Sequence, residues 1–260
     1  MRPLRDWQAD GIVGVFTDID DTLTTEGVIT PNALEALADL KAAGLHVITI
    51  TGRPVGWSEP FAQSWPVDAI VAENGAVALV HEVGQSPRKI YQQQAATRAT
   101  HLKRMQQVLT TIEQTVPGAM RSRDSDGRET DIAIDHSEFT HLSTAAIEAV
   151  VQIMQAAGMT ATISSIHING WYGEHDKLSG ARWIVRELFG RDLDVEIERW
   201  VYVGDSTNDQ VMFKHFDHSV GVANIRRFAD QLQHPPRYIT QGERGNGFVE
   251  LTTHLLKARS

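Results

Sequence analysis

Residues 11–22, GIVGVFTDIDDT, place three aspartates directly after a short apolar run. Such a run between a glycine and a polar loop is typical of a strand that is buried on both faces, as in a parallel sheet. Alternate residues of an extended chain point in one direction, so Asp18 and Asp20 face a common site while Asp21 points elsewhere. The stretch predicts a buried strand that delivers two carboxylates at its end.

Helix and strand patterns alternate after this first strand. Thr30 and Pro31 are the predicted N-cap and first residue of a helix that Gly44 ends. Glu73-Asn74-Gly75 is typical of a hairpin turn between two strands. Where strand, helix and strand follow one another, parallel pairing with right-handed crossovers is expected. The strands predicted in this part of the chain lie at residues 45–50, 68–72 and 76–80.

The middle of the chain predicts a separate module. Polar stretches with glycine at 84–89 and 169–175 are predicted hinges. We therefore expect an inserted α/β cap domain at 84–172, within a core formed by 1–83 and 173–260. Inside the cap, the apolar spacing predicts a helix from Leu102 to Val116, a strand at 132–134, a helix around 147–154 and a strand at 160–168.

The core pattern resumes at Asp176, which can cap a helix that ends at Gly190. A buried strand at 200–203 then ends at Asp205. Together the expected elements describe an α/β fold, with a doubly wound, mainly parallel, Rossmann-like core interrupted by the α/β cap domain. The remaining elements predicted are strands at 219–223 and 238–240 and helices that begin at Ile225 and Phe248.

Composition and charge narrow the class of protein. The 260 residues are 42% hydrophobic and 22% charged, and the formal net charge is -9. An acidic total argues against nucleic-acid or anionic-membrane partners, but not against a small phosphorylated metabolite. The absence of cysteine excludes disulfides, thiolate zinc sites and a cysteine nucleophile. Because there is no signal-peptide pattern and no apolar run near the about 20 residues that span a bilayer, we expect a soluble cytoplasmic protein, a monomer or a homodimer.

Reactive polar residues follow three of the predicted strands. Asp18 and Asp20 end the first strand. Thr51 ends the second, and the bare backbone of Gly52 beside it allows an anion to approach closely. Asp205 ends the strand at 200–203. Because ligands bind at the carboxyl ends of the strands in open α/β sheets, we expect these residues to form one site.

Two more charged residues fit the same site. Asp205 and Asp209 are one helical turn apart and can face one point. Lys177 lies in the first turn of its predicted helix, where the helix dipole disfavours a cation, so a purely structural reason for it is weak. Several carboxylates without cysteine or a histidine cluster describe a site for a hard cation, and Mg²⁺ is the natural occupant.

This set of residues suits phosphoryl transfer. Asp18 could attack phosphorus and form a covalent aspartyl-phosphate. Asp20 would protonate the leaving oxygen and then take a proton from the hydrolytic water. Thr51, Gly52 and Lys177 would hold the phosphoryl oxygens while charge shifts onto them.

Four motifs in this order resemble those of the haloacid dehalogenase-like superfamily. They are Asp-x-Asp-x-Thr at 18–22, the strand-end Thr51, the isolated Lys177 and Gly-Asp-Ser-x-Asn-Asp at 204–209. The insertion between the second and third motifs, which Glu73-Asn74-Gly75-Ala76 announces, resembles the large α/β cap of subclass IIB. That subclass includes Cof-type sugar phosphatases, sucrose-phosphate phosphatases and trehalose-phosphate phosphatases. The resemblance spans nearly the whole chain and implies a phosphatase that acts on a sugar phosphate or similar small metabolite.

The resemblance also implies a set of metal ligands. Mg²⁺ would be held by the side chains of Asp18 and Asp205 and by the backbone carbonyl of Asp20. Asn208 and Asp209 would support the metal or orient the motif lysine. Hydrolysis of a phosphate monoester is therefore the expected activity.

Four further residues are candidate substrate contacts. Arg53 either contacts the substrate or pairs with an acidic neighbour. Trp57, in a predicted loop after the second motif, is a candidate for contact with the ligand. His167 and Asn169 lie where the insertion returns to the core, and either line the substrate pocket or pack the hinge. One departure from the family pattern is Asp21, where glycine is usual; because its side chain should point away from the nucleophile, we expect little effect on the chemistry.

Two other functions fit the same residues. The core could serve as a phosphotransferase or phosphomutase, which would pass the phosphoryl group to an acceptor other than water. It could also be a non-catalytic sensor of a phosphorylated metabolite. An intact acid/base at Asp20 weighs against the sensor, because binding alone does not require one.

Overall fold

A nine-stranded sheet forms the centre of the computed structural model, which describes residues 1–81 and 84–259. Its strand order is β1-β15-β14-β13-β2-β5-β6-β7-β8. The strands from β1 to β6 in this order pair in parallel, and β7 and β8 extend the sheet as antiparallel neighbours. The strands are β1 Arg2–Pro3, β2 Gly14–Thr17, β5 His46–Ile50, β6 Ala69–Ala72, β7 Val77–Val80, β8 Arg88–Tyr91, β13 Trp200–Gly204, β14 His218–Gly221 and β15 Tyr238–Ile239.

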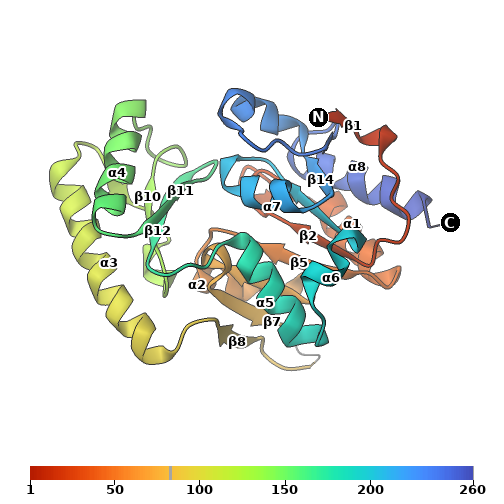
Figure 1. The fold of residues 1–260 in the computed structure, drawn as a ribbon, viewed down its shortest axis with the longest axis horizontal. Helices are drawn as coiled ribbons and strands as arrows, with labels where there is room; N and C mark the ends of the chain where they lie inside the picture. Colours follow the sequence, from red (N-terminus) through yellow and green to blue (C-terminus); the bar gives the residue numbers. More distant parts are fainter. Residues whose placement is uncertain (82–83, 260) are drawn as a thin grey trace.

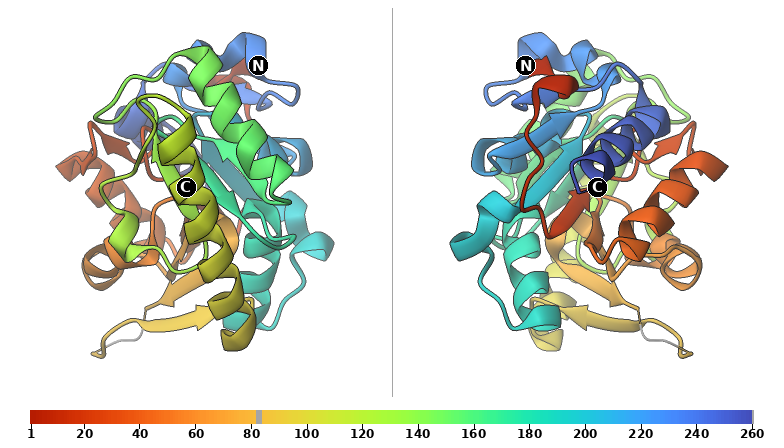
Figure 2. Two further views of the ribbon diagram at one scale, coloured as in Figure 1. Left: turned by 90° about the vertical axis from the view of Figure 1, so that its left-hand side faces the viewer. Right: turned by 90° about the vertical axis from the view of Figure 1, so that its right-hand side faces the viewer.

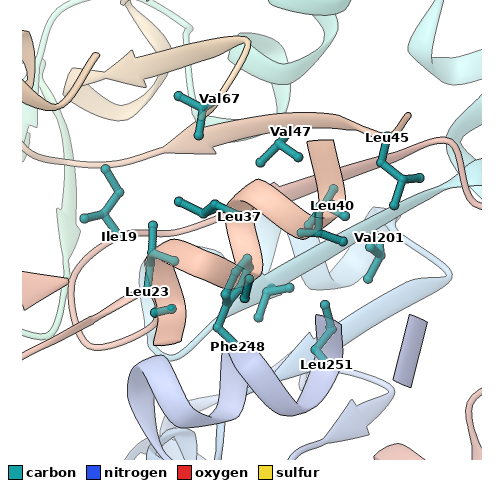
Figure 3. Packing of buried hydrophobic residues seen from close by; sticks show 14 of the residues in the cluster. Ile19, Leu23, Leu37, Leu40, Leu45, Val47, Val67, Val201, Phe248 and Leu251 are labelled. Atoms are coloured by element: carbon teal, nitrogen blue, oxygen red, sulfur yellow. The ribbon is translucent and has the colours of Figure 1, made fainter. Parts of the chain in front are cut away.

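Two apolar layers bury the faces of this sheet. Successive residues of a strand point to opposite faces, so Val15 packs in one buried cluster and Phe16 in the other. Figure 3 shows the first cluster, in which Leu37 and Phe248 from two helices pack with Val47 of the sheet. The helices α1 Pro31–Ala42, α2 Val55–Ser64 and α8 Arg244–Lys257 contribute to the first layer, and α5 Lys177–Phe189, α6 Leu193–Glu196 and α7 Gln210–His215 contribute to the second.

The order of the strands places the functional residues at one edge. β2 lies between β5 and β13 and is parallel to both. The chain continues from β2 to β5 on one side of it within the sheet, and β13 is added later on its other side. This reversal of strand order opens a ligand crevice at the carboxyl ends of the strands. Asp18 follows β2, Thr51 follows β5 and Asp205 follows β13, so all three come to this edge.

Residues 95–171 form a second, smaller α/β layer, which we call the cap domain. Its antiparallel sheet has the order β11-β12-β10-β9, and α3 and α4 cover the face that is turned away from the core (Figure 1 and Figure 2). Ile134 and Ile168 point to these helices in a third buried cluster. Both chain termini lie on the core, away from the cap domain (Figure 1). The elements are α3 Ala95–Thr115, β9 Met120–Arg121, β10 Ile132–Asp135, α4 Thr144–Ala156, β11 Thr160–Ile163 and β12 His167–Trp171.

Short elements complete the chain. β3 Thr24–Thr25 and β4 Val28–Ile29 form a small antiparallel hairpin just after the aspartate cluster. Within the described residues, no helix is both long and apolar enough to cross a membrane. The 3-10 helices are η1 Leu4–Asp6, η2 Glu73–Gly75, η3 Ser125–Gly127, η4 Ile197–Arg199, η5 Thr207–Asp209 and η6 Ala223–Gln231.

The fold class agrees with the prediction, but the hinge predicted at 84–89 differs from the structure. β8 pairs with β7 in the core sheet, so the predicted hinge at 84–89 is partly a core strand. Residues 82–83, on the expected boundary, lie outside the described residues. We propose that the cap domain begins after Tyr91, and that the chain returns to the core between Trp171, the last residue of β12, and Lys177, the first residue of α5.

The single strand predicted at 160–168 is wrong. The structure has two antiparallel strands, β11 and β12, joined by a tight turn. Ser164 makes this turn, because its hydroxyl oxygen accepts from the backbone N–H groups of Ile166 and His167 at 3.3 and 3.0 Å. β12 also runs on to Trp171, so the predicted hinge at 169–175 begins too early.

Three predictions about helices also needed correction. Helix α2, which contains Trp57, is not expected from the sequence, because Pro54 and Pro60 disfavour a helix. Its first backbone N–H group has a partner that is distant in sequence, since the Val55 N–H donates to Glu73 Oε1 at 3.0 Å. The segment from Ile225 belongs to the 3-10 helix η6. Helix α8 begins at Arg244 rather than Phe248, where the Arg244 N–H donates to an asparagine side chain at 2.8 Å.

Candidate active site

Lys177 joins two aspartates at the carboxyl edge of the core sheet. Its Nζ lies 2.7 Å from Asp18 Oδ1 and 2.7 Å from Asp209 Oδ1. The lysine is 2% exposed and Asp209 is fully buried. Tyr202 of β13 donates its hydroxyl to the same Asp209 oxygen. The residues expected to be nucleophile and phosphate ligand are therefore in direct contact.

The surrounding carboxylates explain how a buried lysine can begin a helix. Asp176 caps α5 and forms a capping box with Ser179, which places Lys177 at the first helical position. Burial and the helix dipole both disfavour a cation there. Although burial alone would lower it, Asp18 and Asp209 raise the pKa of Lys177 above its usual range. Burial, opposed by the charge of Lys177, raises the pKa of Asp18 to about 7.

Asp205 has much less compensation for its charge. It is fully buried, and Asn224 Nδ2 donates to its Oδ2 at 2.9 Å. Thr22 Oγ1 lies 3.5 Å from Oδ1, and Arg227 Nη2 is 3.6 Å from Oδ2. Burial, reinforced by the charge of Asp18, raises the pKa of Asp205 well above its usual range. A buried carboxylate in this situation fits a site for a cation, which would stabilise its ionised form.

The three buried aspartates could hold a metal ion, but they are not equivalent. Ligand oxygens of Asp18, Asp205 and Asp209 lie within 4.8 Å of one another. Asp209 Oδ1 already accepts from the lysine and the tyrosine, and its Oδ2 accepts from the backbone N–H groups of Asp205 and Ser206 at 2.9 and 3.1 Å. With both oxygens engaged, Asp209 is better placed to orient Lys177 than to bind a metal. Asp18 and Asp205 are the better pair of side-chain ligands.

Thr51 and Gly52 lie at the joint between core and cap domain. Thr51 Oγ1 accepts from the Arg53 N–H at 3.0 Å, and this bond does not use the hydroxyl proton. The Gly52 carbonyl accepts from Arg128 Nη1 at 3.0 Å and from Asn169 Nδ2 at 3.2 Å, both from the cap domain. A Cβ atom at position 52 would lie only 3.3 Å from the Asn169 side chain, so glycine permits this close approach.

Of the two alternatives for Arg53, the structure shows pairing with acidic neighbours. Its Nε lies 3.0 Å from both carboxylate oxygens of Asp20. Its Nη2 lies 2.8 Å from Glu138 Oε1, and its Nη1 lies 3.2 Å from Asp124 Oδ2. Arg53 therefore connects the expected acid/base of the core with two carboxylates of the cap domain.

The remaining candidate contacts occupy different places. Asn169 faces the core, since it contacts Gly52, and His167 shares that face because it is two residues away on β12. His167 Nε2 lies 2.9 Å from Glu138 Oε2. Trp57 packs its ring 4.9 Å from the Arg53 guanidinium rather than lying in a loop. Trp57 thus contacts Arg53 directly, and His167 contacts the same glutamate that pairs with Arg53.

Two cavities adjoin this centre. One, of about 420 Å³, is lined by Lys177 and Asn208 of the core and by Thr162 of the cap domain. In this cavity wall, Asn208 accepts from the Ser206 hydroxyl at 2.8 Å. The other cavity, of about 330 Å³, has Asp20 in its wall. Both volumes suit a small metabolite rather than a polymer.

Several residues of the centre were missed from the sequence. Asn224 follows β14 closely, so the rule that strand ends carry function could have found it. Tyr202 lies within the apolar strand expected at 200–203, where its sequence context gives no sign that its hydroxyl contacts Asp209. Asn74 has a left-handed backbone (φ 55°), is 2% exposed, and its Nδ2 has no hydrogen-bond partner among the described residues. Glu138, in a cap loop, had no signal in the sequence.

Comparison with known proteins agrees with the resemblance drawn from the four motifs. The family model for haloacid dehalogenase-like hydrolases matches residues 15–112, which include most of β2 and the first two motifs. No curated protein matches the chain. The match covers less than half of the chain, and it agrees with the resemblance that the motifs carry.

Solved structures share the fold over nearly the whole chain. A protein from Thermoplasma acidophilum has a TM-score of 0.72 at 15% identity, with 94% of this chain and 98% of that chain covered. The sucrose-phosphatase from Synechocystis, solved with sucrose and phosphate, has a TM-score of 0.66 at 13% identity, covering 94% and 97%. A trehalose-6-phosphate phosphatase related protein has a TM-score of 0.60 at 16% identity, covering 94% and 96%. These likenesses include the cap domain and establish a shared fold.

Proposed function

We propose that the protein is a Mg²⁺-dependent phosphatase that hydrolyses a small phosphate monoester through an aspartyl-phosphate on Asp18. The observation that carries the proposal is the placing of Lys177, whose Nζ lies 2.7 Å from Asp18 and from Asp209. A buried lysine beside a buried carboxylate at a strand end positions both a nucleophile and a cation for the phosphoryl group. The family match and the phosphatases among the structures of the same fold support it.

In the first half of the reaction, a carboxylate oxygen of Asp18 attacks phosphorus and the bond from phosphorus to the leaving oxygen breaks. Asp20 gives its proton to that oxygen, so the product leaves as an alcohol. Lys177 holds Asp18 through Oδ1 and offers its charge to the phosphoryl oxygens. The Thr51 hydroxyl and the Gly52 backbone donate to the same oxygens.

In the second half, water attacks the phosphorus of the aspartyl-phosphate and the bond to Asp18 breaks. Asp20 takes the proton from this water, and phosphate leaves, so both aspartates return to their starting states. The cap domain closes the site against bulk water through its contacts to Gly52 and Arg53.

The Asp18 and Asp205 side chains and the backbone carbonyl of Asp20 would hold Mg²⁺. When bound, the ion supplies positive charge that offsets the repulsion between the aspartates and a phosphate dianion. Asn224 would hold Asp205 in place, since it donates to one carboxylate oxygen at 2.9 Å. Asp209 keeps Lys177 directed at Asp18.

A sugar phosphate is the substrate class that we propose. The cavities of about 420 and 330 Å³ next to the centre are of suitable size for a small metabolite. The sucrose-phosphatase of the same fold was solved with sucrose and phosphate, which is a precedent for this class. The side chains that contact the sugar would come from the face of the cap domain that carries His167 and Asn169.

Phosphate release from 4-nitrophenyl phosphate and a panel of sugar phosphates, with and without Mg²⁺, tests the proposal. We expect Mg²⁺-dependent turnover that falls by about three orders of magnitude or more in Asp18→Asn, because the nucleophile is lost. Asp39→Asn is the matched control, since Asp39 is exposed on α1. Undiminished turnover in folded Asp18→Asn would contradict the mechanism, and a phosphorylated acceptor in place of free phosphate would indicate a phosphotransferase.

A further inference from the structure

The cavity beside Asp20 is where the leaving group must lie if the proposed acid/base is correct. The Asp20 carboxylate forms part of its wall, and a general acid has to come within hydrogen-bond distance of the oxygen it protonates. The volume is about 330 Å³. Its other walls come from the hairpin that carries Glu26, from the cap loop that carries Glu138, and from Arg244 at the start of α8. Three parts of the chain that are distant in sequence thus enclose the leaving group.

Negative charge exceeds positive charge in this wall. Asp20, Asp21, Glu26 and Glu138 line the cavity, against Arg53 and Arg244. Arg53 is already shared: it contacts Asp20, Glu138 and, behind the wall, Asp124. It therefore has little capacity left for an anion on the substrate.

Arg244 is engaged in the same way. Its Nε lies 3.1 Å from Asp21 Oδ1, and its Nη1 lies 3.9 Å from Glu26 Oε1. The Glu26 side chain is 85% exposed, so most of its charge faces the solvent at the mouth of the cavity. Glu138 is held more firmly, because its backbone N–H donates to Asp135 Oδ1 at 2.9 Å. Of the carboxylates that line the cavity, Glu138 is held by these contacts, whereas Glu26 is largely exposed at the mouth.

We propose that this cavity selects the leaving group by charge, favouring one with an ammonium group over a neutral one and disfavouring one with a second anion. The inference rests on the proposed function and specifies its substrate class. Glu138 is the specificity-determining residue, because it is fixed between Arg53 and His167 at 2.8 and 2.9 Å. An ammonium group would add a partner for its carboxylate, whereas a substrate carboxylate would meet it as a like charge.

Matched phosphate esters test the order of preference. Glucosamine 6-phosphate and glucose 6-phosphate differ by an ammonium group in place of a hydroxyl. Sorbitol 6-phosphate and 6-phosphogluconate differ by a carboxylate in place of an alcohol. For the wild-type enzyme with Mg²⁺, we expect kcat/KM to be about fivefold higher for the first member of each pair, the size of effect for one partly exposed charge pair.

The variant Glu138→Gln keeps the shape of the side chain and removes its charge. We expect the ratio within each pair to fall by about threefold to fivefold, whatever the change in overall rate. Glu148→Gln is the matched control, since Glu148 is exposed on α4 of the cap domain and away from the cavity. If Glu138→Gln does not fold, Glu26→Gln at the exposed mouth replaces it, with a smaller shift in the same direction.

The possible outcomes separate this inference from the proposed function. Equal or better turnover of 6-phosphogluconate than of sorbitol 6-phosphate by the wild-type enzyme would overturn the charge selection. Ratios that stay unchanged in both Glu138→Gln and Glu26→Gln would overturn it as well. Absence of Mg²⁺-dependent phosphate release from every ester, including 4-nitrophenyl phosphate, would instead refute the proposed function.

Discussion

The candidate catalytic edge, formed by Asp18, Lys177, Asp205 and Asp209, and the interface between cap domain and core both bury charged side chains. The two regions differ in how many hydrogen-bond and ion-pair partners these side chains have. At the candidate catalytic edge, Lys177 contacts both Asp18 and Asp209, while among the described residues buried Asp205 has one close side-chain partner, Asn224 at 2.9 Å, and longer contacts. At the interface, which consists of the contacts of Gly52, Arg53 and Glu73 with the cap domain, the buried groups have several close partners each.

Glu73 illustrates the second kind of site. It is fully buried, and its carboxylate accepts from the backbone N–H groups of Val55, Glu129 and Thr130 and from the Thr130 hydroxyl, at 2.5 to 3.1 Å. A buried carboxylate with a full set of hydrogen-bond donors makes the interface rigid. A buried carboxylate that lacks donors is a candidate ligand for a cation. Glu73 therefore connects the core to residues 129 and 130 through a complete set of donors, whereas Asp205 is a candidate metal ligand.

Replacing Lys177 should have the largest effect at the catalytic edge. In Lys177→Met the phosphoryl group loses its fixed cation and Asp18 loses its partner at 2.7 Å. We expect kcat/KM for 4-nitrophenyl phosphate to fall by about 10²–10³-fold, as when one donor to a developing anion is removed. Arg186→Met on the exposed side of the same helix is the control for a lost cation on α5. A loss of less than tenfold in Lys177→Met would show that the lysine does not contact the reacting group.

Replacing Glu73 should mainly affect the joint. In Glu73→Gln an amide NH2 group replaces one carboxylate oxygen, so it faces either the Val55 N–H or the N–H and hydroxyl of Thr130. We expect the free energy of unfolding to fall by about 3 kcal/mol, because a buried donor loses its acceptor and the charge that strengthened the remaining bonds is gone. Urea unfolding measures this change, and Glu59→Gln, with a half-exposed side chain, is the control. An unchanged free energy of unfolding would mean that the contacts of Glu73 are not maintained in solution.

The same contrast explains what could be predicted from the sequence. Residues at the catalytic edge directly follow buried strands, so Asp18, Thr51 and Asp205 are found from local patterns and one rule about parallel sheets. Because Asp176 is recognisable as an N-cap, the sequence also predicts correctly that Lys177 lies in the first turn of its helix. These features depend on short stretches of chain.

The interface could not be predicted in this way, because its partners are far apart in sequence. Arg53 meets Asp124 and Glu138, which are 71 and 85 residues away. Helix α2 was missed for a related reason, since its first N–H group is satisfied by Glu73 rather than by a local cap. The hinge predicted at 84–89 overlaps β8, because Arg88 and Lys89 are charged and it is the pairing with β7 that places Arg88–Tyr91 in the core sheet.

His175 offers the smallest and most specific test, because it lies in the return from the cap domain to the core. It is 6% exposed and stacks on Trp171 with ring centroids 5.4 Å apart, and neither ring nitrogen has a hydrogen-bond partner among the described residues. Burial lowers the pKa of His175 from its usual 6.5 to about 4. Above pH 6.5 the ring is neutral in both the folded and the unfolded chain, so it contributes no dependence on pH.

Between pH 6.5 and 4 the unfolded chain binds a proton that the folded protein does not bind, so this contribution to stability is lost as the pH falls. The loss should be about 2 kcal/mol at pH 5. In His175→Phe, which can keep the stacking on Trp171, the free energy of unfolding should decrease by about 2 kcal/mol less than in the wild type between pH 7.5 and 5. Urea unfolding at both pH values measures this difference, with exposed His234→Asn as the control. Parallel losses in wild type and His175→Phe would show that the ring takes up a proton in the folded protein as readily as in the unfolded chain, which would contradict its burial.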